Sequence, residues 1–315
     1  MSNPLQKLFD EFIGECRFAR RRRPETIRGY KAVFDPFIKL MPDVTLAKLT
    51  PETITEFYQK LQTRQRFVGS NGSIVKIGVK DSTIGTYQRR LHTFFEWLFI
   101  KGHVLSNPIK QMKKIKLNYS DPKSIRKPDM DKIRTAVESR PSSLLHLKRD
   151  RAMVAVFLFT GIRLGELLGL KVTDVDFIRQ TLRVDGETSK SKRTRFIPLN
   201  PHVTLVLDDY LQERNKKRFY TTASLFVSLH EDRGLSKDGL KHWVKRLVKL
   251  SGVKFHSHRF RHTFASNLGA SGVSAIQIQK LMGHTDLRMT QAYVRSLNVD
   301  DFRGVTNVLT FEDLN

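Results

Sequence analysis

The chain has 315 residues, of which 39% are hydrophobic and 10% aromatic, which is enough apolar material for the cores of two ordinary domains and excludes an intrinsically disordered protein. The 56 Lys and Arg residues outnumber the 31 Asp and Glu residues and give a net charge of +25, so nucleic acid is the expected partner. A single cysteine, Cys16, with no long apolar run and no signal-peptide pattern, argues against a disulfide framework, a thiolate metal cage and a membrane protein, and favours a cytoplasmic, nucleoid-associated protein.

Residues 1–110 are expected to form a helical domain. The spacing of the apolar residues predicts four amphipathic helices, over residues 4–19, 24–38, 51–61 and 82–101. Thr50 stands where an N-cap precedes a helix that begins with Pro51, and Gly102 is placed to end the last helix. Residues 66–80 are rich in Gly, Ser and Asn and indicate either a loop or a small hairpin.

Two segments carry concentrated positive charge. Arg20 to Arg23 form a run of four arginines, and residues 111–127 form a linker that contains many basic residues. The linker either follows a phosphate backbone or is an ordinary solvated connector. The arginine run likewise lies either on a solvated face or on a face that contacts DNA.

Residues 128–315 are expected to form a second, mixed domain. The β-branched and aromatic residues of 176–184 and 194–199 predict two strands of a small antiparallel sheet. The apolar run 153–162 is too short to span a bilayer and indicates a buried helix that Gly161 ends. The fold class is therefore mainly α with a small antiparallel sheet. The helices of this domain are predicted over residues 129–139, 150–160, 163–170, 201–217, 236–250, 258–269, 273–282 and 287–295.

The most informative stretch runs from His256 to Tyr293. It supplies an imidazole, a guanidinium, a second imidazole and a phenol in succession, at His258, Arg261, His284 and Tyr293. His258 and Arg261 are three residues apart, so on a helix both project from one face. Fixed donors of this kind can meet the negative charge that grows on the non-bridging oxygens during transfer at a phosphodiester. The stretch suits chemistry on a phosphate, but it lacks a second guanidinium and a general acid.

Separate segments of the chain resemble the tyrosine recombinases, also called the phage integrase family. HRFRHTFAS and LMGHTDLRMTQAYV resemble the family's second motif, and TGIRLGELLGL resembles its first motif, around an arginine. TSKSKRTRFIPL resembles the β-hairpin segment that carries the family's lysine, with Lys190 as its counterpart and Lys192 as the second choice. The two arginine motifs stand almost a hundred residues apart, in the family's order. The resemblance places the catalytic residues at Arg163, Lys190, His258, Arg261, His284 and Tyr293.

The resemblance implies a role for each of these side chains. Tyr293 would attack the scissile phosphate, leaving a 3′-phosphotyrosine and a free 5′-hydroxyl. Arg163 and Arg261 would hold the non-bridging oxygens, with a further hydrogen bond from the second histidine, His284. The lysine would protonate the departing 5′-oxygen, and His258 would help to remove the tyrosine proton.

The family's site needs no cofactor and no metal. Glu166, three residues after Arg163, stands where the family often has an acidic residue that orients the site, and we expect it to support Arg163 rather than to touch DNA. His262 lies inside the second motif but receives no chemical role.

The resemblance also implies the architecture and the partners. A helical, SAM-like core-binding domain and an α+β catalytic domain would clamp double-stranded DNA that carries a pair of inverted core half-sites. A homotetramer on two sites would exchange strands through a Holliday junction, in integration, excision or resolution, with or without accessory factors. The C-terminal residues 296–315 either dock on a neighbouring subunit or on their own. Because the first apolar stripe starts at Leu5, we expect no arm-binding domain before it, as in the simple Xer-like and transposon or plasmid resolution recombinases.

Metal-dependent interpretations have less support in the sequence than the metal-free chemistry on a phosphate described above. His256, His258 and His262 have a plausible zinc spacing, but no cysteine or carboxylate stands beside them and the arginines between them would repel a cation. Asp174 and Asp176 suggest a metal nuclease, although acids beside a strand are more typical of turns.

Two other functions stay open at this point. A type IB topoisomerase-like enzyme would relax DNA with a similar tyrosine site and without exchanging partners, and a non-catalytic protein would bind DNA only. No phosphate-binding loop of the G-x-x-x-x-G-K-[ST] kind is present, so nucleotide hydrolysis is not expected.

Overall fold

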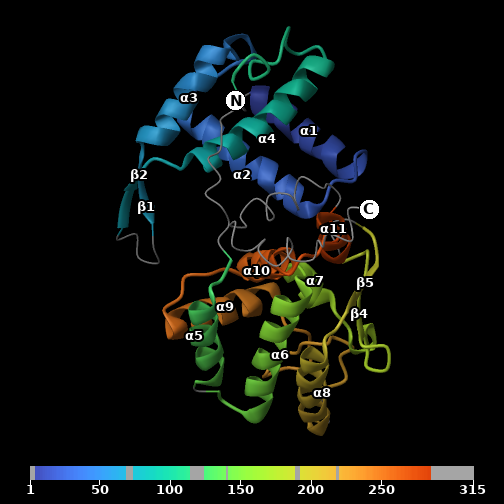
Figure 1. The fold of residues 1–315 in the computed structure, drawn as a ribbon. Coiled ribbons are helices and arrows are strands. Elements are labelled where there is room, and N and C mark those ends of the chain that lie inside the picture. Colours follow the sequence, from blue (N-terminus) through green and yellow to red (C-terminus); the bar gives the residue numbers. More distant parts are fainter. Residues whose placement is uncertain are drawn as a thin grey trace, which may run out of the picture. The chain divides into compact units, whose positions relative to one another are not determined.

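The computed structural model describes residues 4–68, 74–113, 124–139, 141–188, 192–217 and 220–284. The chain divides into two compact units, Met1–Tyr119 and Ser120–Asn315, which Figure 1 colours along the sequence. Each unit has a hydrophobic core of its own, so each is described by itself.

The first unit is built on the four helices that the apolar spacing predicts. They are α1 (Pro4–Phe18), α2 (Pro24–Leu40), α3 (Pro51–Thr63) and α4 (Asp81–Ile100), with a short 3-10 turn, η1 (Leu46–Lys48), before α3. The side chain of Thr50 accepts a hydrogen bond from the Thr53 N–H, which confirms the predicted N-cap. Aromatic rings fill the core: Phe9 and Phe34 stack with centroids 3.7 Å apart, and Phe94 meets both of them edge-on.

The segment between α3 and α4 is a hairpin and not a plain loop. Strand β1 (Gln65–Val68) pairs antiparallel with β2 (Ile74–Ile77), and Phe67 stands opposite Val75. The hairpin projects from the end of α3, away from the other helices of its unit, in Figure 1. Phe67, Val75 and Ile77 share one face of it and are all exposed.

The second unit combines seven described helices with a three-stranded antiparallel sheet, which confirms the predicted fold class. The sheet has the order β3-β4-β5, with Leu182 paired to Ile197. Within the described ranges, no helix combines the length and the hydropathy needed to cross a bilayer. The elements are α5 (Lys127–Glu138), α6 (Leu144–Thr160), α7 (Leu164–Gly169), the 3-10 turn η2 (Val172–Asp174), β3 (Val175–Asp176), β4 (Thr181–Val184), β5 (Arg195–Pro198), α8 (Pro201–Lys216), α9 (Lys237–Ser251), α10 (Ser257–Ala270) and α11 (Ala275–Met282).

Two predicted boundaries were wrong. Helix α6 begins at Leu144 and not near residue 150, because the Ser143 side chain accepts a hydrogen bond from the His146 N–H and caps the helix there. The single strand predicted over 176–184 is two strands with a turn between them, in which the Asp176 carboxylate accepts from the N–H groups of Ile178 and Arg179. The helix predicted over 287–295 lies outside the described residues.

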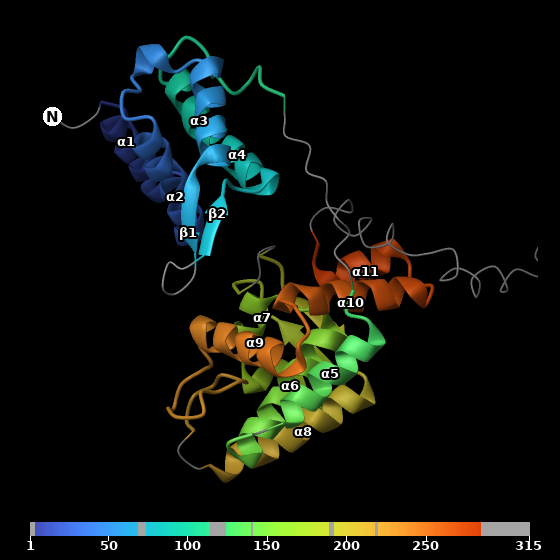
Figure 2. The same cartoon turned by 90° about the vertical axis from the view of Figure 1, so that its left-hand side faces the viewer.

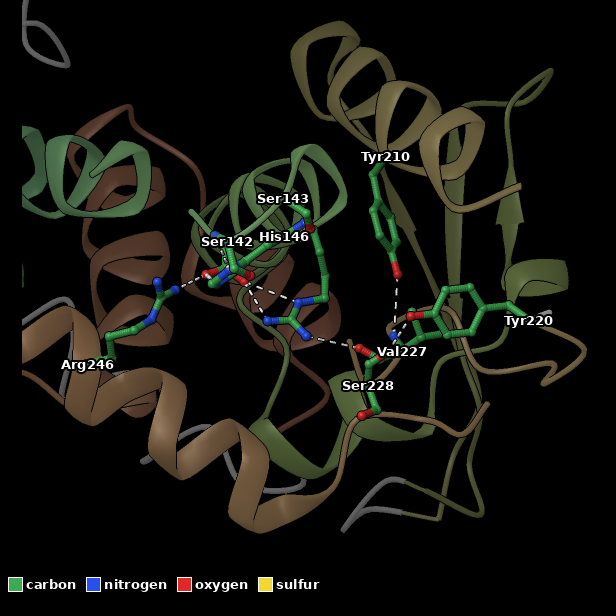
Figure 3. Close-up of polar contacts among 10 residues, drawn as sticks. Ser142, Ser143, His146, Tyr210, Tyr220, Val227, Ser228 and Arg246 are labelled. Atoms are coloured by element: carbon green, nitrogen blue, oxygen red, sulfur yellow. Dashed lines mark hydrogen bonds and ion pairs between the residues drawn. The ribbon is translucent and has the colours of Figure 1, made fainter. Parts of the chain in front are cut away.

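A buried ionic cluster joins α6 to α9 and to the segment after α8. Asp150 on α6 is fully buried and contacts His146 Nε2 at 3.3 Å, Arg149 Nη2 at 2.9 Å and the Arg246 guanidinium. Arg149 also donates to the Val227 carbonyl at 3.1 Å. Figure 3 shows His146 and Arg246 pointing toward this cluster, with the 227–228 backbone on its other side. Three cationic or protonatable groups around one carboxylate fix these elements to one another.

Candidate functional site

Four segments of the second unit meet at the C-terminal end of α11: the loop after α6, the start of α7, the first residue of β5, and α10. Figures 1 and 2 both show α10 beside α11 and against α6. Carbonyls at a helix end have no partner inside the helix and carry the negative end of its dipole. Three consecutive carbonyls at the end of α11 accept from three arginines: Leu281 from Arg195 at 2.9 Å, Met282 from Arg261 at 2.6 Å and Gly283 from Arg163 at 3.4 Å.

Arg261 is held by backbone carbonyls from two elements. Only 1% of it is exposed, and besides Met282 it donates to the Gly161 carbonyl at 2.6 Å. Gly161 ends α6 with φ 59°, and a Cβ there would come within 2.4 Å of Phe264, so this position requires glycine. The guanidinium of Arg261 therefore ties the loop after α6 to the end of α11.

Glu166 is the anionic centre of the site. It is 1% exposed, and its carboxylate accepts from the Arg163 N–H at 2.8 Å and from Arg163 Nη1 at 2.9 Å. Arg195 donates to the same carboxylate through two N–H groups, at 3.2 and 2.8 Å. Burial alone would raise the pKa of Glu166, but the hydrogen bonds and charges of the two arginines outweigh it and lower that pKa to about 2. Glu166 is therefore ionised and orients Arg163.

Three histidines of the site are neutral at physiological pH. Desolvation, followed by the charge of Arg261, lowers the pKa of His258 to about 4, although the side chain keeps an exposed part. His284 directly follows Gly283 and is 7% exposed; burial and the charges of Arg261 and Arg163 lower its pKa to about 3. The His262 ring meets the His258 ring edge-on, with centroids 4.7 Å apart, and burial lowers the pKa of His262 to about 4. A neutral His258 can accept a proton, and a neutral His284 can still donate one hydrogen bond.

These depressed pKa values predict that acid destabilises the DNA-free protein well before carboxylates titrate. His262 and His284 are both buried, with folded pKa values of about 4 and 3 against 6.5 for the free side chain. The unfolded chain therefore binds more protons below pH 6.5, so the stabilisation present above pH 6.5 is lost as the pH falls toward the folded pKa values. Urea unfolding between pH 7 and 5 measures this effect. The His284→Gln variant should lower the slope of the unfolding free energy against pH by about 1 kcal/mol per pH unit, whereas the exposed His230→Gln should not; equal slopes would contradict the assigned burial.

Among the residues that the structure describes, no three His, Cys, Asp or Glu side chains are grouped to hold a metal ion. Asp174 and Asp176 serve as turn residues: the Asp174 carboxylate accepts from the Lys171 N–H at 2.8 Å, and that of Asp176 closes the turn after β3.

The described part of the site brings together four of the six predicted catalytic residues with Glu166. Lys190 and Tyr293 lie outside the described residues. The second choice for the lysine, Lys192, is described; it is exposed and has a φ of 54° in the segment before β5. Sequence reasoning gave Arg195 no part in the site. The single signal for it was its position in the strand predicted over residues 194–199, just after the two candidate lysines.

Comparisons with known proteins agree with this geometry. Residues 123–299, more than half of the chain, match the phage integrase family. The tyrosine recombinase XerD of Listeria innocua serovar 6a is 29% identical over 294 residues, which covers 92% of this chain and 94% of that protein. Two solved structures share the fold. The Tn1549 transposon integrase in complex with transposon right end DNA has a TM-score of 0.73 and 18% identity, covering 96% of this chain and 98% of that one. A lambda integrase tetramer bound to a Holliday junction has a TM-score of 0.70 and 20% identity, covering 94% and 79%. The chain thus belongs to the phage integrase family, the tyrosine recombinases.

Proposed function

We propose that this protein is a site-specific DNA recombinase that cuts and rejoins strands through a covalent bond between Tyr293 and a 3′-phosphate. The observation that carries the proposal is the meeting of Arg163, Arg261, His258 and His284 around the end of α11. Two of these side chains are guanidiniums and two are neutral imidazoles. This is the donor and base set that attack on a phosphodiester requires.

The proposed reaction balances without a cofactor. The Tyr293 oxygen forms a bond to phosphorus as the bond to the 5′-oxygen breaks, and His258 accepts the phenolic proton. Arg163, Arg261 and His284 stabilise the charge on the non-bridging oxygens, and Lys190, with Lys192 as the second choice, supplies a proton to the 5′-oxygen. Attack by a 5′-hydroxyl on the phosphotyrosine reverses these steps and reseals the strand, because the covalent intermediate keeps the energy of the broken bond.

The partner in this proposal is double-stranded DNA. The net charge of +25 and the exposed arginines Arg21, Arg22 and Arg23 before α2 support an electrostatic contact with its backbone. We extend to this chain the arrangement of the lambda integrase tetramer on a Holliday junction. A homotetramer would hold two DNA sites, each with a pair of inverted half-sites, and the two domains of each subunit, residues 1–110 and 128–315, would grip opposite faces of the duplex.

Plasmids with one or two copies of the site test this function. DNA trapped covalently on the protein is first sequenced to identify the site. We then expect a plasmid with two sites to give recombinant products that differ in connectivity from the parent. A plasmid with one site should give none. Relaxation of both plasmids without recombinants would assign a type IB topoisomerase activity instead, and binding without any covalent complex would assign a DNA-binding role alone.

A further inference from the structure

Arg195 is an arginine of the site to which the family resemblance assigns no role, and its contacts link three elements. Its side chain is about 10% exposed, and it is the first residue of β5. It reaches α7 through Glu166 and the end of α11 through the Leu281 carbonyl. Arg195 thus lies where the β4–β5 hairpin, the start of α7 and the segment before His284 meet.

The contact with Glu166 sets the position of Arg163. Arg195 donates to both carboxylate oxygens, which is the parallel two-bond pairing that only a guanidinium provides. Arg163 uses the same two oxygens. Without Arg195, Glu166 would lose two of the four hydrogen bonds that fix its carboxylate, and the support of Arg163 would loosen with it.

The contact with α11 sets the position of His284. Arg195 Nε donates to the Leu281 carbonyl at 2.9 Å, and its side chain lies close to Gly283, where an added Cβ would come within 3.0 Å of Arg195 Nη1. Gly283 ends α11 with φ 63° and is followed directly by His284. The backbone that aims His284 is therefore held on one side by Arg195.

The hairpin that carries the predicted general acid is anchored beside this point. β4 and β5 enclose the segment 185–194, and a Cβ on Gly169 of α7 would come within 2.4 Å of the Thr188 side chain. The hairpin thus touches α7 at two places, Thr188 against Gly169 and Arg195 on Glu166.

We propose that Arg195 is a positioning residue: it sets Arg163 through Glu166 and His284 through the end of α11, and so aligns the groups that meet the scissile phosphate. The proposal rests on the proposed function for its effect on DNA cleavage. The positioning of His284 is a property of the DNA-free protein and can be measured separately.

Cleavage kinetics give the chemical test. The variant is Arg195→Gln, and the matched control is Arg193→Gln, which removes the same charge two residues away at an exposed position. With saturating suicide DNA, we expect Arg195→Gln to lower the single-turnover cleavage rate about 100-fold while half-saturation is unchanged, as loss of a supporting contact does. Arg193→Gln should keep the wild-type rate. Arg195→Lys keeps the charge without the two-bond pairing and should fall between the two.

A neutral substrate separates positioning from general destabilisation. A methylphosphonate at the scissile position removes the negative charge that Arg163 would hold, so the deficit of Arg195→Gln should shrink to a few-fold on that substrate. A merely structural defect would be equally large on both substrates and would overturn the proposal. A wild-type rate in Arg195→Lys would overturn it as well, because a lysine cannot form the pairing.

Nuclear magnetic resonance of the histidine rings tests the same proposal without DNA. The His284 signals, assigned from His284→Gln, should shift in Arg195→Gln and stay in place in Arg193→Gln. Unmoved His284 signals would overturn the proposal whether or not the protein cleaves DNA. Conversely, a shift in a protein that never forms a covalent complex would leave the positioning role standing and refute the recombinase function.

Discussion

We expect the Tyr293→Phe variant to form no covalent complex with DNA, with a loss of at least about 10⁴-fold in cleavage, the scale seen when a catalytic nucleophile is removed. The substitution removes the hydroxyl that would attack the phosphate and keeps the ring. Binding should remain close to wild type and equally sensitive to salt, because the phosphate contacts that supply affinity come from basic residues elsewhere. A nicked suicide duplex that carries the identified site measures both properties, the complex by denaturing gel and the binding by mobility shift.

Tyr220→Phe is the matched control. The Tyr220 hydroxyl donates to the Ser228 carbonyl at 2.7 Å, and burial raises the pKa of this phenol. Tyr210 is even less suited than Tyr220 to act as a nucleophile, because it is fully buried and burial raises its pKa to about 12. We therefore expect Tyr220→Phe to cleave at the wild-type rate. A covalent complex formed by Tyr293→Phe would refute the assignment of the nucleophile.

The second large effect concerns stability and should follow from Asp150→Asn. Removing one charge of a buried ion pair leaves its partners buried and uncompensated, which costs about 3–5 kcal/mol. Here Arg149 and Arg246 would lose their common counter-ion. Burial would raise the pKa of Asp150, but the His146 hydrogen bond and the charges of Arg149 and Arg246 outweigh it, so the pKa is lowered. The contribution of this carboxylate is therefore complete above its unfolded pKa and is lost as the pH falls through the folded value.

Urea unfolding at pH 7 followed by tryptophan fluorescence measures this loss in the second unit. Trp243 on α9 is buried in that unit, and Trp97 lies in the core of the other. We expect the transition that Trp243 reports to move to lower urea in Asp150→Asn. Asp238→Asn, the same change in an exposed ion pair with Lys241, should move it little. An unchanged midpoint in Asp150→Asn would mean that the buried cluster does not hold α6 and α9 together.

The sequence predicts local structure well where one face of an element is apolar. The four helices of the first unit follow directly from the 3.6-residue spacing of their apolar residues, and α7 to α11 begin and end within two residues of their predicted ranges. The start of α6 was missed because its apolar residues lie all around the helix, so no one-sided apolar pattern shows where the helix begins. The Ser143 cap marks its first turn instead. The turn inside 176–184 was missed because it depends on hydrogen bonds that the Asp176 carboxylate accepts from the N–H groups of Ile178 and Arg179, rather than on the apolar pattern.

The site could be predicted only where motifs carry it. Arg163, His258, Arg261 and His284 were identified from the sequence and do meet in the structure. The contribution of Arg195 could not be predicted, because its partners are 29 residues away on α7 and 86 residues away on α11. Pairing at such separations is decided by how the elements pack. The roles proposed for Tyr293 and Lys190 rest on the family motifs.

Mass spectrometry of the trapped complex tests the central claim most directly. After cleavage of the suicide duplex, nuclease digestion and trypsin treatment, the peptide of residues 289–295 should carry a nucleotide 3′-phosphate, and fragmentation should place it on Tyr293. This peptide contains one tyrosine and no serine, so Thr290 is its single other hydroxyl. A nucleotide on any other residue, or cleavage without a covalent peptide, would contradict the account.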